Sequence, residues 1–328
     1  MEQLLKSRYK AQEKISENPF SVTYQGITLS TQKPVIIKIY KRGTLNSTLI
    51  KSMKQKVQLL SRLEHPNIAR LIDGDYGWQG FYYVREYVNG KSLAELKAGR
   101  KFDTEEVRQI GLVASEALDR AHQAGIVHGS LSLNNLLVRN DNSIVLTDFV
   151  IEGEIKEAQP QKTVYIMEHP EVLSPEEIQG DCARRSSDIY SLGFSLYNLL
   201  SKKDLAEQRL GLALKKMKGD LPPLANVDRY MNDILQKALN PDPQLSFCGA
   251  QEMRRSFENR SLMGQKAALS DLPPIEMVDR PQVKEEPKEV VVVKKERKRS
   301  FYLLIIVVLA IAAGLVYSLV NSYFLSFQ

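Results

Sequence analysis

The chain has 328 residues, 43% of them hydrophobic and 26% charged, which suits one large two-lobed globular domain or two ordinary ones. Its net charge is +6, but the run KKERKR at 294–299 supplies much of the excess, so the sequence predicts no nucleic-acid-binding surface. The two cysteines, Cys182 and Cys248, lie far apart without metal-type spacing, which favours reduced thiols over a disulfide framework.

Residues 1–88 have the pattern of strands with one helix. The runs YKAQEKI, VTYQGITL, PVIIKIYK and FYYVREYV favour short strands, because they are broken by Pro, Gly and Asn. Between the last two runs, residues 47–65 have apolar residues at helical spacing. This part of the chain therefore predicts a small β-rich lobe.

Residues 89–262 are mostly helical in pattern. The best-defined helix begins at Asp103 and Thr104, has early acidic residues and closes at Gly125. Residues 263–300 are rich in Pro, Glu and Lys and poor in aromatic residues, which indicates a disordered or extended tether.

Residues 303–320 are uncharged and apolar, and they are long enough to cross a hydrocarbon core of about 30 Å. Aromatic residues flank the run on both sides, as in interfacial belts. A buried core helix is the alternative, but the run has no polar stripe. We expect a transmembrane helix at 301–324, and the basic cluster before it predicts that the preceding domain stays in the cytoplasm.

Three small residues in this run, Ala310, Gly314 and Ser318, recur every four positions and so share one helix face. Such faces favour close helix pairing in membranes, which makes a homodimer through the tail one hypothesis. Small residues are common in membrane segments, so the pattern is at least as well explained without pairing.

Several stretches of residues 8–260 resemble the landmarks of a protein kinase domain, in order and spacing. They are VIIK, LEHPNIARL, REYVNGKSL, HGSLSLNNLLV, LTDFV, MEHPEVL and SSDIYSLGFSLYNLL. The resemblance implies an α+β, bilobal fold with a β-rich N-lobe at 1–88 and a helical C-lobe at 89–262. The amino-acid sequences of these stretches are similar to those of bacterial serine/threonine kinases. That makes a bacterial cytoplasmic membrane the first choice of location, and the cytosolic face of a eukaryotic organelle the alternative.

The resemblance also implies sites for ATP and Mg²⁺. It makes Lys38 the lysine that pairs with phosphates, and Asn135 and Asp148 the two metal ligands. An equally good reading of Asn135 and Asp148 is structural, with both hydrogen-bonded to nearby backbone. The cofactor expectation is therefore weak or absent binding of ATP and Mg²⁺.

The adenine pocket is altered relative to the family. Glu86 and Val88 stand at the hinge, and Leu137 is the retained floor residue. Ile36 replaces a small alanine, and Arg85 stands at the gatekeeper position just before the hinge. Because a guanidinium is not buried without a partner, we expect Arg85 to fill the back pocket or to reach Asp148.

The catalytic loop has lost its chemical groups. Where the family has Arg, Asp and Lys, this chain has Gly129, Ser130 and Ser132. Losing a positioned base costs on the order of 10²–10⁴ in rate, and a serine hydroxyl is a very weak base. Ser132 removes a cation that steadies the transferred phosphoryl group, and Gly129 removes the arginine that docks a phosphorylated activation loop.

The partner of Lys38 is also missing. Lys56 stands where the family has a helix Glu, and residues 44–63 contain no Asp or Glu. Two ammonium groups at about 4 Å repel by about 4 kcal/mol at an effective dielectric near 20. We therefore expect that Lys56 turns away, or that Asp148 lies between the two lysines.

The phosphate loop lacks its glycines. Ser16, Asn18 and Ser21 stand in their places, and Pro19 lacks an N–H. This favours an ordinary hairpin turn over a phosphate cradle.

Positions that carry packing in the family are mostly retained. His128, Phe149 and Leu60 match residues that stack between the lobes, and Asp188 and Glu171 are present. Chemical positions are mostly lost, which is typical of a pseudokinase.

Three hypotheses follow. The first is a membrane-anchored, tail-anchored pseudokinase that acts as a protein-binding scaffold or regulatory module in signalling. The alternative is a divergent active serine/threonine kinase that uses Lys38, Asn135 and Asp148, with a base from the substrate or from Glu152 or Glu154. The third is a structural role in which self-association through the tail is the main function.

Overall fold

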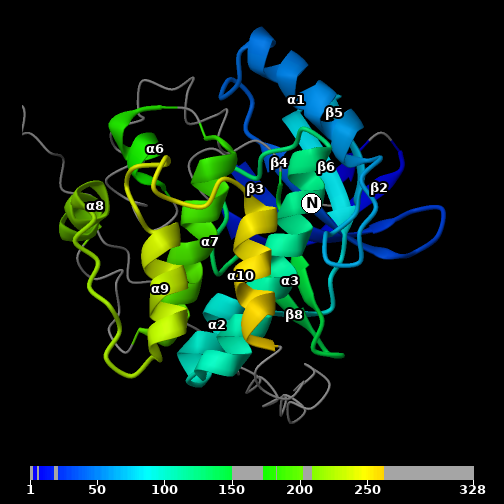
Figure 1. Ribbon diagram of the computed structural model, residues 1–328. Coiled ribbons are helices and arrows are strands. Elements are labelled where there is room, and N and C mark those ends of the chain that lie inside the picture. Colours follow the sequence, from blue (N-terminus) through cyan, green and yellow to red (C-terminus); the bar gives the residue numbers. More distant parts are fainter. Residues whose placement is uncertain are drawn as a thin grey trace, which may run out of the picture. The chain divides into compact units, whose positions relative to one another are not determined.

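The computed structural model describes residues 3–5, 7–17, 21–149, 173–181, 183–201 and 209–261 (Figure 1). All of them belong to Met1–Ile275, the first of two units into which the chain divides. The second unit, Glu276–Gln328, lies outside the described residues, as do the predicted tether and transmembrane helix. Within the described ranges, no helix has the length and apolar character needed to cross a membrane.

Strands dominate the first part of the described chain and helices the second. The elements of the first part are β1 (Gln3–Leu5), β2 (Tyr9–Glu17), β3 (Ser21–Thr28), β4 (Pro34–Tyr40), α1 (Ser47–Leu60), β5 (Leu71–Gly77) and β6 (Gly80–Glu86). Those of the second part are β7 (Gly90–Ser92), α2 (Leu93–Gly99), α3 (Thr104–Gln123), β8 (Leu136–Arg139), β9 (Ile144–Leu146), α6 (Pro175–Gln179), α7 (Arg185–Leu200), α8 (Arg209–Lys218), α9 (Arg229–Ala238) and α10 (Ala250–Ser261).

The six-stranded sheet is antiparallel throughout, in the order β1-β2-β3-β4-β6-β5. The four strands predicted from sequence are β2, β3, β4 and β6. β5 was not expected, because LIDGDYG is rich in Asp and Gly, and its pairing with β6 overrides that low propensity. Helix α1 packs on β5, where a Cβ at Gly74 would lie 2.9 Å from Val57 Cγ2, so this close approach requires glycine.

Both predicted helices form, with different accuracy at their ends. Helix α3 has the expected start, a capping box between Asp103 and Glu106, and Gly125 follows its end with a φ of +76°. Helix α1 starts at Ser47 but ends at Leu60, five residues before the expected end. Pro66 disfavours helical geometry at His65, so the expected end at His65 was unfavourable.

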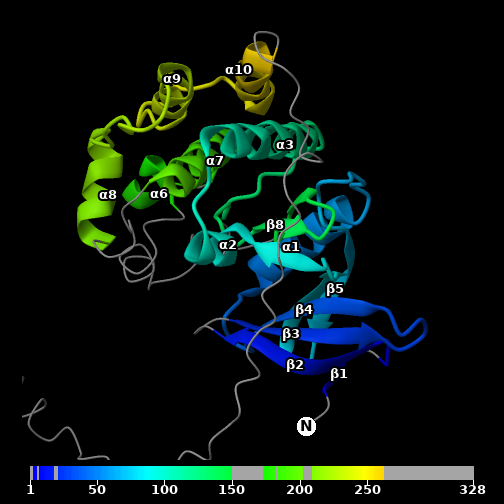
Figure 2. The same ribbon diagram turned by 90° about the horizontal axis from the view of Figure 1, so that it is seen from below.

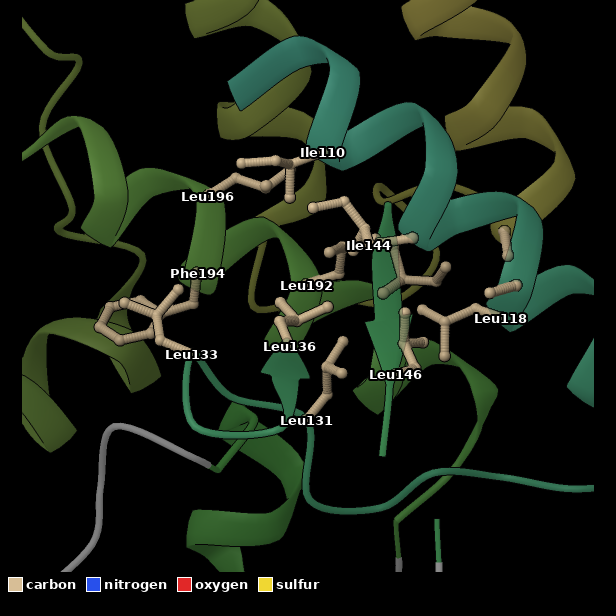
Figure 3. Close-up of a cluster of buried hydrophobic side chains, with 14 of the residues drawn as sticks. Ile110, Leu118, Leu131, Leu133, Leu136, Ile144, Leu146, Leu192, Phe194 and Leu196 are labelled. Atoms are coloured by element: carbon tan, nitrogen blue, oxygen red, sulfur yellow. The ribbon is translucent and has the colours of Figure 1, made fainter. Parts of the chain in front are cut away.

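The main hydrophobic core lies among α3, α7, α10 and the β8–β9 hairpin, and it continues under α1. Figure 3 shows side chains of α3 and α7 meeting those of the hairpin; the labelled ones are Ile110, Leu118, Leu131, Leu133, Leu136, Ile144, Leu146, Leu192, Phe194 and Leu196. The short strands β7, β8 and β9 form a second sheet.

The two parts of the chain are joined beside β9. Leu146 donates its N–H to the Asn67 carbonyl and accepts from the N–H of Ala69, both at 2.8 Å. Figure 2 shows the strands β1 to β5 gathered apart from helices α3, α7 and α9. The predicted two-lobed α+β arrangement is confirmed, and the segment after β9 is held against the large sheet.

Candidate active site

One face of the large sheet carries three polar side chains close together. β4 and β6 pair with Lys38 opposite Tyr83 and with Ile36 opposite Arg85. Because alternate residues of a strand share a face, Lys38, Tyr83 and Arg85 all point to the same side. All three are buried, and Arg85 is only 8% exposed. A buried guanidinium requires a partner on this face.

That partner is Asp148, two residues beyond β9. Arg85 Nε lies 3.0 Å from Oδ1 and Nη2 lies 3.3 Å from Oδ2, so the guanidinium grips the carboxylate with two nitrogens. The Tyr83 hydroxyl donates to Oδ1 at 2.8 Å, and the Thr147 hydroxyl donates to Oδ2 at 3.2 Å. Of the two expectations for Arg85, the structure has the one in which it reaches Asp148.

Asp148 has a φ of +61°, in the left-handed region that non-glycine residues rarely adopt. Its neighbour Thr147 is fixed on both sides, donating its N–H to the Asn135 carbonyl at 2.9 Å and accepting at its own carbonyl from His128 Nε2 at 3.0 Å. The strained backbone therefore aims the carboxylate at the sheet face.

The charged and polar groups around Asp148 determine its protonation state and that of Tyr83. Burial alone raises the pKa of Asp148, but the charges of Arg85 and Lys38 and the hydrogen bonds from Arg85 and Tyr83 hold that pKa well below its usual range. Burial and the nearby carboxylate raise the pKa of the Tyr83 phenol well above its ordinary value. At neutral pH, Asp148 is therefore ionised and Tyr83 is a neutral donor.

Lys56 is half-buried on α1, and its charge, together with the larger effect of burial, lowers the pKa of His128. The direct hydrogen bonds described for Asp148 come from Arg85, Tyr83 and Thr147, while Lys38 acts on it through its charge. Arg85 is thus a further cation at Asp148, beside the charge of Lys38. Whether Lys56 turns away stays a prediction.

The loop before β8 is held by a second buried carboxylate, Asp188 on α7. Its oxygens accept the backbone N–H groups of His128 and Gly129, each at 2.8 Å, and His122 Nε2 lies 2.8 Å away. Gly129 has a φ of +72°, which favours glycine at a position where the kinase family has arginine. The predicted packing role of Asp188 therefore has a physical basis.

His128 is fully buried and neutral. The N–H of Ser130 donates to its Nδ1 at 3.3 Å, so Nε2 carries the ring proton and donates to the Thr147 carbonyl. Burial lowers the pKa of His128, which agrees with this tautomer. Its ring lies 4.5 Å from that of Phe149, as the predicted stacking requires.

Ser130 and Asn135 contact each other in the catalytic-type loop. Ser130 is 5% exposed, and its carbonyl accepts a bond of 2.7 Å from Asn135 Nδ2. The N–H of Asn135 donates to the Ser132 carbonyl at 3.0 Å. Since its amide nitrogen is committed to the loop, a metal contact by Asn135 would have to use its oxygen.

The hinge residue Glu86 is engaged at both backbone groups. Its N–H donates to the Arg70 carbonyl at 2.9 Å, and its carbonyl accepts from Arg85 Nη1 at 3.2 Å. Its carboxylate lies 3.3 Å from Arg139 Nη2. Glu86, which the sequence analysis assigned to the adenine pocket, therefore has both backbone groups hydrogen-bonded within the protein.

The two apolar residues predicted for the adenine pocket are brought together. Val88 is buried in a small cluster with Ala69 and Val145, and Leu137 packs against it. This placement agrees with a shared wall, while their role in binding stays a prediction.

Magnesium does not fit Asp148 in this arrangement. Mg²⁺ binds carboxylate oxygens at about 2 Å, but both oxygens of Asp148 already accept bonds from Arg85, Tyr83 or Thr147. A divalent ion about 4 Å from a guanidinium would be repelled by about 8 kcal/mol at an effective dielectric near 20. In the described part of the chain, no three His, Cys, Asp or Glu residues gather in a way that could hold a metal ion.

Tyr83 is the site residue that the sequence patterns missed. An aromatic residue in a strand is ordinarily a core residue, but its position two before Arg85 placed it on the same face. Other predicted residues lie outside the described ranges: Asn18, Pro19, Glu152, Glu154, Glu171 and Cys182, with Ala310, Gly314 and Ser318 of the tail.

The family model and the similar curated proteins all point to one family, the protein kinases. The model of the protein kinase domain matches residues 9–256. A probable serine/threonine-protein kinase of Clostridium perfringens is 26% identical over 263 residues, covering 78% of this chain and 38% of the relative. The serine/threonine-protein kinase PrkC of Bacillus subtilis is 28% identical over 262 residues, covering 77% and 40%. The chain thus spans about two fifths of the length of these curated relatives.

Among solved structures, the chain is similar to the PknI kinase domain of Mycobacterium tuberculosis. The TM-score is 0.57 at 18% identity, and the match covers 78% of this chain and 97% of that one. At this identity the likeness supports the fold alone. Protein kinases normally use ATP and Mg²⁺, so the family match is consistent with these cofactors, whose binding the sequence analysis expects to be weak or absent.

Proposed function

The chain belongs to the protein kinase domain family, and we propose that it acts as a pseudokinase, a kinase-fold module that binds a partner protein without transferring phosphate. The observation that carries the proposal is the grip of Arg85 on Asp148. A protein kinase uses this carboxylate to hold the metal ions that neutralise the transferred phosphoryl group. Here a side chain of the same protein neutralises it instead.

The catalytic-type loop supports the same proposal. Ser130 stands at the position of the base and is buried, with its N–H bonded to His128 and its carbonyl to Asn135. A hydroxyl in this position cannot hold the proton of a substrate hydroxyl near neutral pH. The loss of a positioned base alone costs on the order of 10²–10⁴ in rate.

The second candidate is the active serine/threonine kinase, and the names of the relatives favour it over the pseudokinase. The curated relatives are called serine/threonine-protein kinases, and Lys38, Asn135 and Asp148 are all present. In this candidate, Arg85 must leave Asp148 before a metal ion can bind. The base must then come from the substrate or from a residue outside the described ranges, such as Glu152 or Glu154.

The remaining sequence-based expectations enter as parts of the proposal. We propose that residues 301–324 anchor the protein in a membrane, first of all the bacterial cytoplasmic membrane, with the kinase-like domain on the cytoplasmic side. Self-association through Ala310, Gly314 and Ser318 would then bring two such domains together. An unchanged oligomeric state of Gly314→Ile in detergent would argue against that self-association.

A phosphotransfer assay separates the two candidates. The purified full chain is incubated with labelled ATP, Mg²⁺ or Mn²⁺, and generic protein substrates, beside Lys38→Ala and Lys33→Ala. Lys33 is an exposed lysine just before β4 and serves as the matched control. We expect no label above the Lys38→Ala background. Metal-dependent label that Lys38→Ala removes and Lys33→Ala keeps would establish the active kinase instead.

A further inference from the structure

An exposed tryptophan occupies the tip of the β5–β6 hairpin. Trp78 and Gln79 form a two-residue turn between the paired glycines Gly77 and Gly80, and Trp78 is 75% exposed. Turns of this length are ordinarily built from Asn, Asp and Gly, and an exposed indole contributes little burial to the fold. Tyr76, two residues earlier in the same hairpin, is 40% exposed. The requirements of folding therefore do not account for these two rings.

The chain beside this tip is basic. Residues 40–63 contain six Lys or Arg residues and no Asp or Glu. A Cβ at Gly80 would lie 3.2 Å from the backbone nitrogen of Arg42, so the end of the hairpin lies directly against the start of this basic stretch. Arg42 itself is exposed. A guanidinium and an indole therefore share one end of the large sheet.

Helix α1 brings further cations to the hairpin. Lys54 of α1 pairs with Asp75 of β5 at 2.7 Å, and Val57 packs against Gly74, so the helix runs antiparallel to the strand. Figure 1 shows α1 alongside β5. Lys51, which is exposed, lies one turn before Lys54 on the same side of the helix. It therefore lies toward the tip of the hairpin.

Acidic side chains offset only part of this charge. Beside the pair between α1 and β5, Lys41 pairs with Glu17 at 2.7 Å, and Glu17 also pairs with Lys14 at 3.1 Å. One carboxylate is thus shared by two lysines. In the part of the chain that the structure describes, neither Arg42 nor Lys51 takes part in an ion pair. The surface around the tip keeps a positive charge.

An exposed indole and phenol beside exposed cations match the boundary of a bilayer. Rings with one polar edge prefer the level of the lipid headgroups, and Lys and Arg are attracted to anionic lipids. At protein interfaces, by contrast, the aromatic anchors lie in the centre of a patch that excludes water. Trp78 stands at the outermost position of a hairpin, so its placement favours a lipid surface over a protein partner.

We propose that the hairpin surface, made of Tyr76, Trp78, Arg42 and Lys51, binds the headgroup region of an anionic membrane. The two rings enter the interface and the two cations contact lipid phosphates. The inference goes beyond the proposed function, and it does not depend on residues 301–324, because all four residues lie in the described part of the chain.

The test uses Trp78 as its own reporter, since it is the only tryptophan of the chain. The full chain is transferred to vesicles of phosphatidylcholine alone, or of phosphatidylcholine mixed with phosphatidylglycerol, in each case with and without brominated acyl chains. We expect bromine to quench Trp78 emission in the anionic vesicles, together with a shift to shorter wavelength. In the neutral vesicles we expect little quenching.

Charge variants keep the reporter in place. Each removed cation should weaken the contact by about fivefold, so in Arg42→Ala/Lys51→Ala the quenching should fall to the level of the neutral vesicles. Lys33→Ala is the matched control, because Lys33 is exposed and precedes β4, whereas Arg42 follows it. This variant should keep the quenching of wild type.

Two results would overturn the inference. One is Trp78 that stays open to aqueous iodide and escapes bromine in anionic vesicles, which would leave the surface to a protein partner. The other is equal quenching in both lipids that the charge variants do not change, because anionic headgroups would then play no part. If the double variant failed to fold, high salt would test the same charges in wild type, where it should reduce the quenching.

Discussion

Two buried carboxylates, Asp188 and Asp148, lie on either side of the His128 loop, and they are stabilised in different ways. Asp188 accepts from two backbone N–H groups and from His122, all supplied by the helical part of the chain. Asp148 is held by the side chains of Arg85, Tyr83 and Thr147. Both have a pKa below the ordinary value for aspartate, although burial alone would raise it.

The two carboxylates differ in the kind of donor that holds them: mainly backbone groups at Asp188, and side chains at Asp148. Backbone donors to Asp188 exist only when the loop is folded, so this carboxylate is part of the architecture. The bonds to Asp148 come from side chains, so they can be changed without removing a backbone bond of the loop. We therefore expect variants at the two sites to behave differently.

The largest effect is expected for Asp188→Ala. The change leaves the N–H groups of His128 and Gly129 and the ring of His122 without their acceptor in a buried place, at about 1–3 kcal/mol for each unsatisfied group. We expect the free energy of unfolding to fall by about 4 kcal/mol, measured by urea denaturation.

The control is Asp233→Ala on α9. The Asp233 side chain is 70% exposed, and its ion-pair partner Arg229 is 94% exposed. Such pairs contribute little, so the loss should stay below about 0.5 kcal/mol. Equal losses in the two variants would show that the Asp188 network does not carry the fold.

Arg85→Met should have the next largest effect, a loss of about 3 kcal/mol, because it removes the counter-charge that is hydrogen-bonded to the buried carboxylate of Asp148. Asp148→Asn in the same chain should recover much of that loss, since the group left behind is then neutral. A double-mutant cycle on unfolding free energies measures the coupling. Additive losses would mean that the two side chains do not act as a pair.

The sequence predicted the position of Asp148 and gave its contact with Arg85 as one of two alternatives, because the order and spacing of the kinase-like stretches indicate which residues face each other. It did not predict the role of Tyr83. Its pattern as a buried aromatic strand residue is the same whether its hydroxyl has a partner or not. The hydroxyl's partner comes from a segment 65 residues away in the chain, and local patterns contain no information on such a contact.

Element ends and short strands were the weaker part of the prediction. β5 is formed by pairing with β6 in spite of its Asp and Gly residues, and β7 to β9 are three or four residues long. Strands of this length contain too few residues for an alternating pattern. Their existence depends on tertiary pairing, whereas the well-capped α3 could be read directly from its own residues.

The pH dependence of stability should distinguish wild type from the Asp148→Asn variant. The pKa of Asp148 is lower in the folded protein than the unfolded value of about 3.9. Its contribution is therefore fully present above about pH 5 and is lost as the pH falls through the folded pKa. We expect wild type to lose more unfolding free energy than Asp148→Asn between about pH 5 and 3, measured by urea denaturation at each pH. Parallel curves would contradict the assigned ion pair.

The smallest effect is expected for Tyr83→Phe, which removes one of the four hydrogen bonds described for Asp148 and leaves the grip of Arg85 in place. Because the bond joins a neutral donor to a charged acceptor, the loss in unfolding free energy should be about 1.5 kcal/mol, the lower end for bonds to charged groups. Tyr82→Phe is the matched control, since Tyr82 is the neighbouring residue of β6, points to the opposite face, and its buried hydroxyl has no hydrogen-bond partner within the described structure. That variant should be neutral or slightly stabilising, because it removes an unsatisfied polar group. If the two variants lost the same amount, the Tyr83 hydroxyl would contribute nothing to Asp148, and Arg85 alone would have to hold the carboxylate.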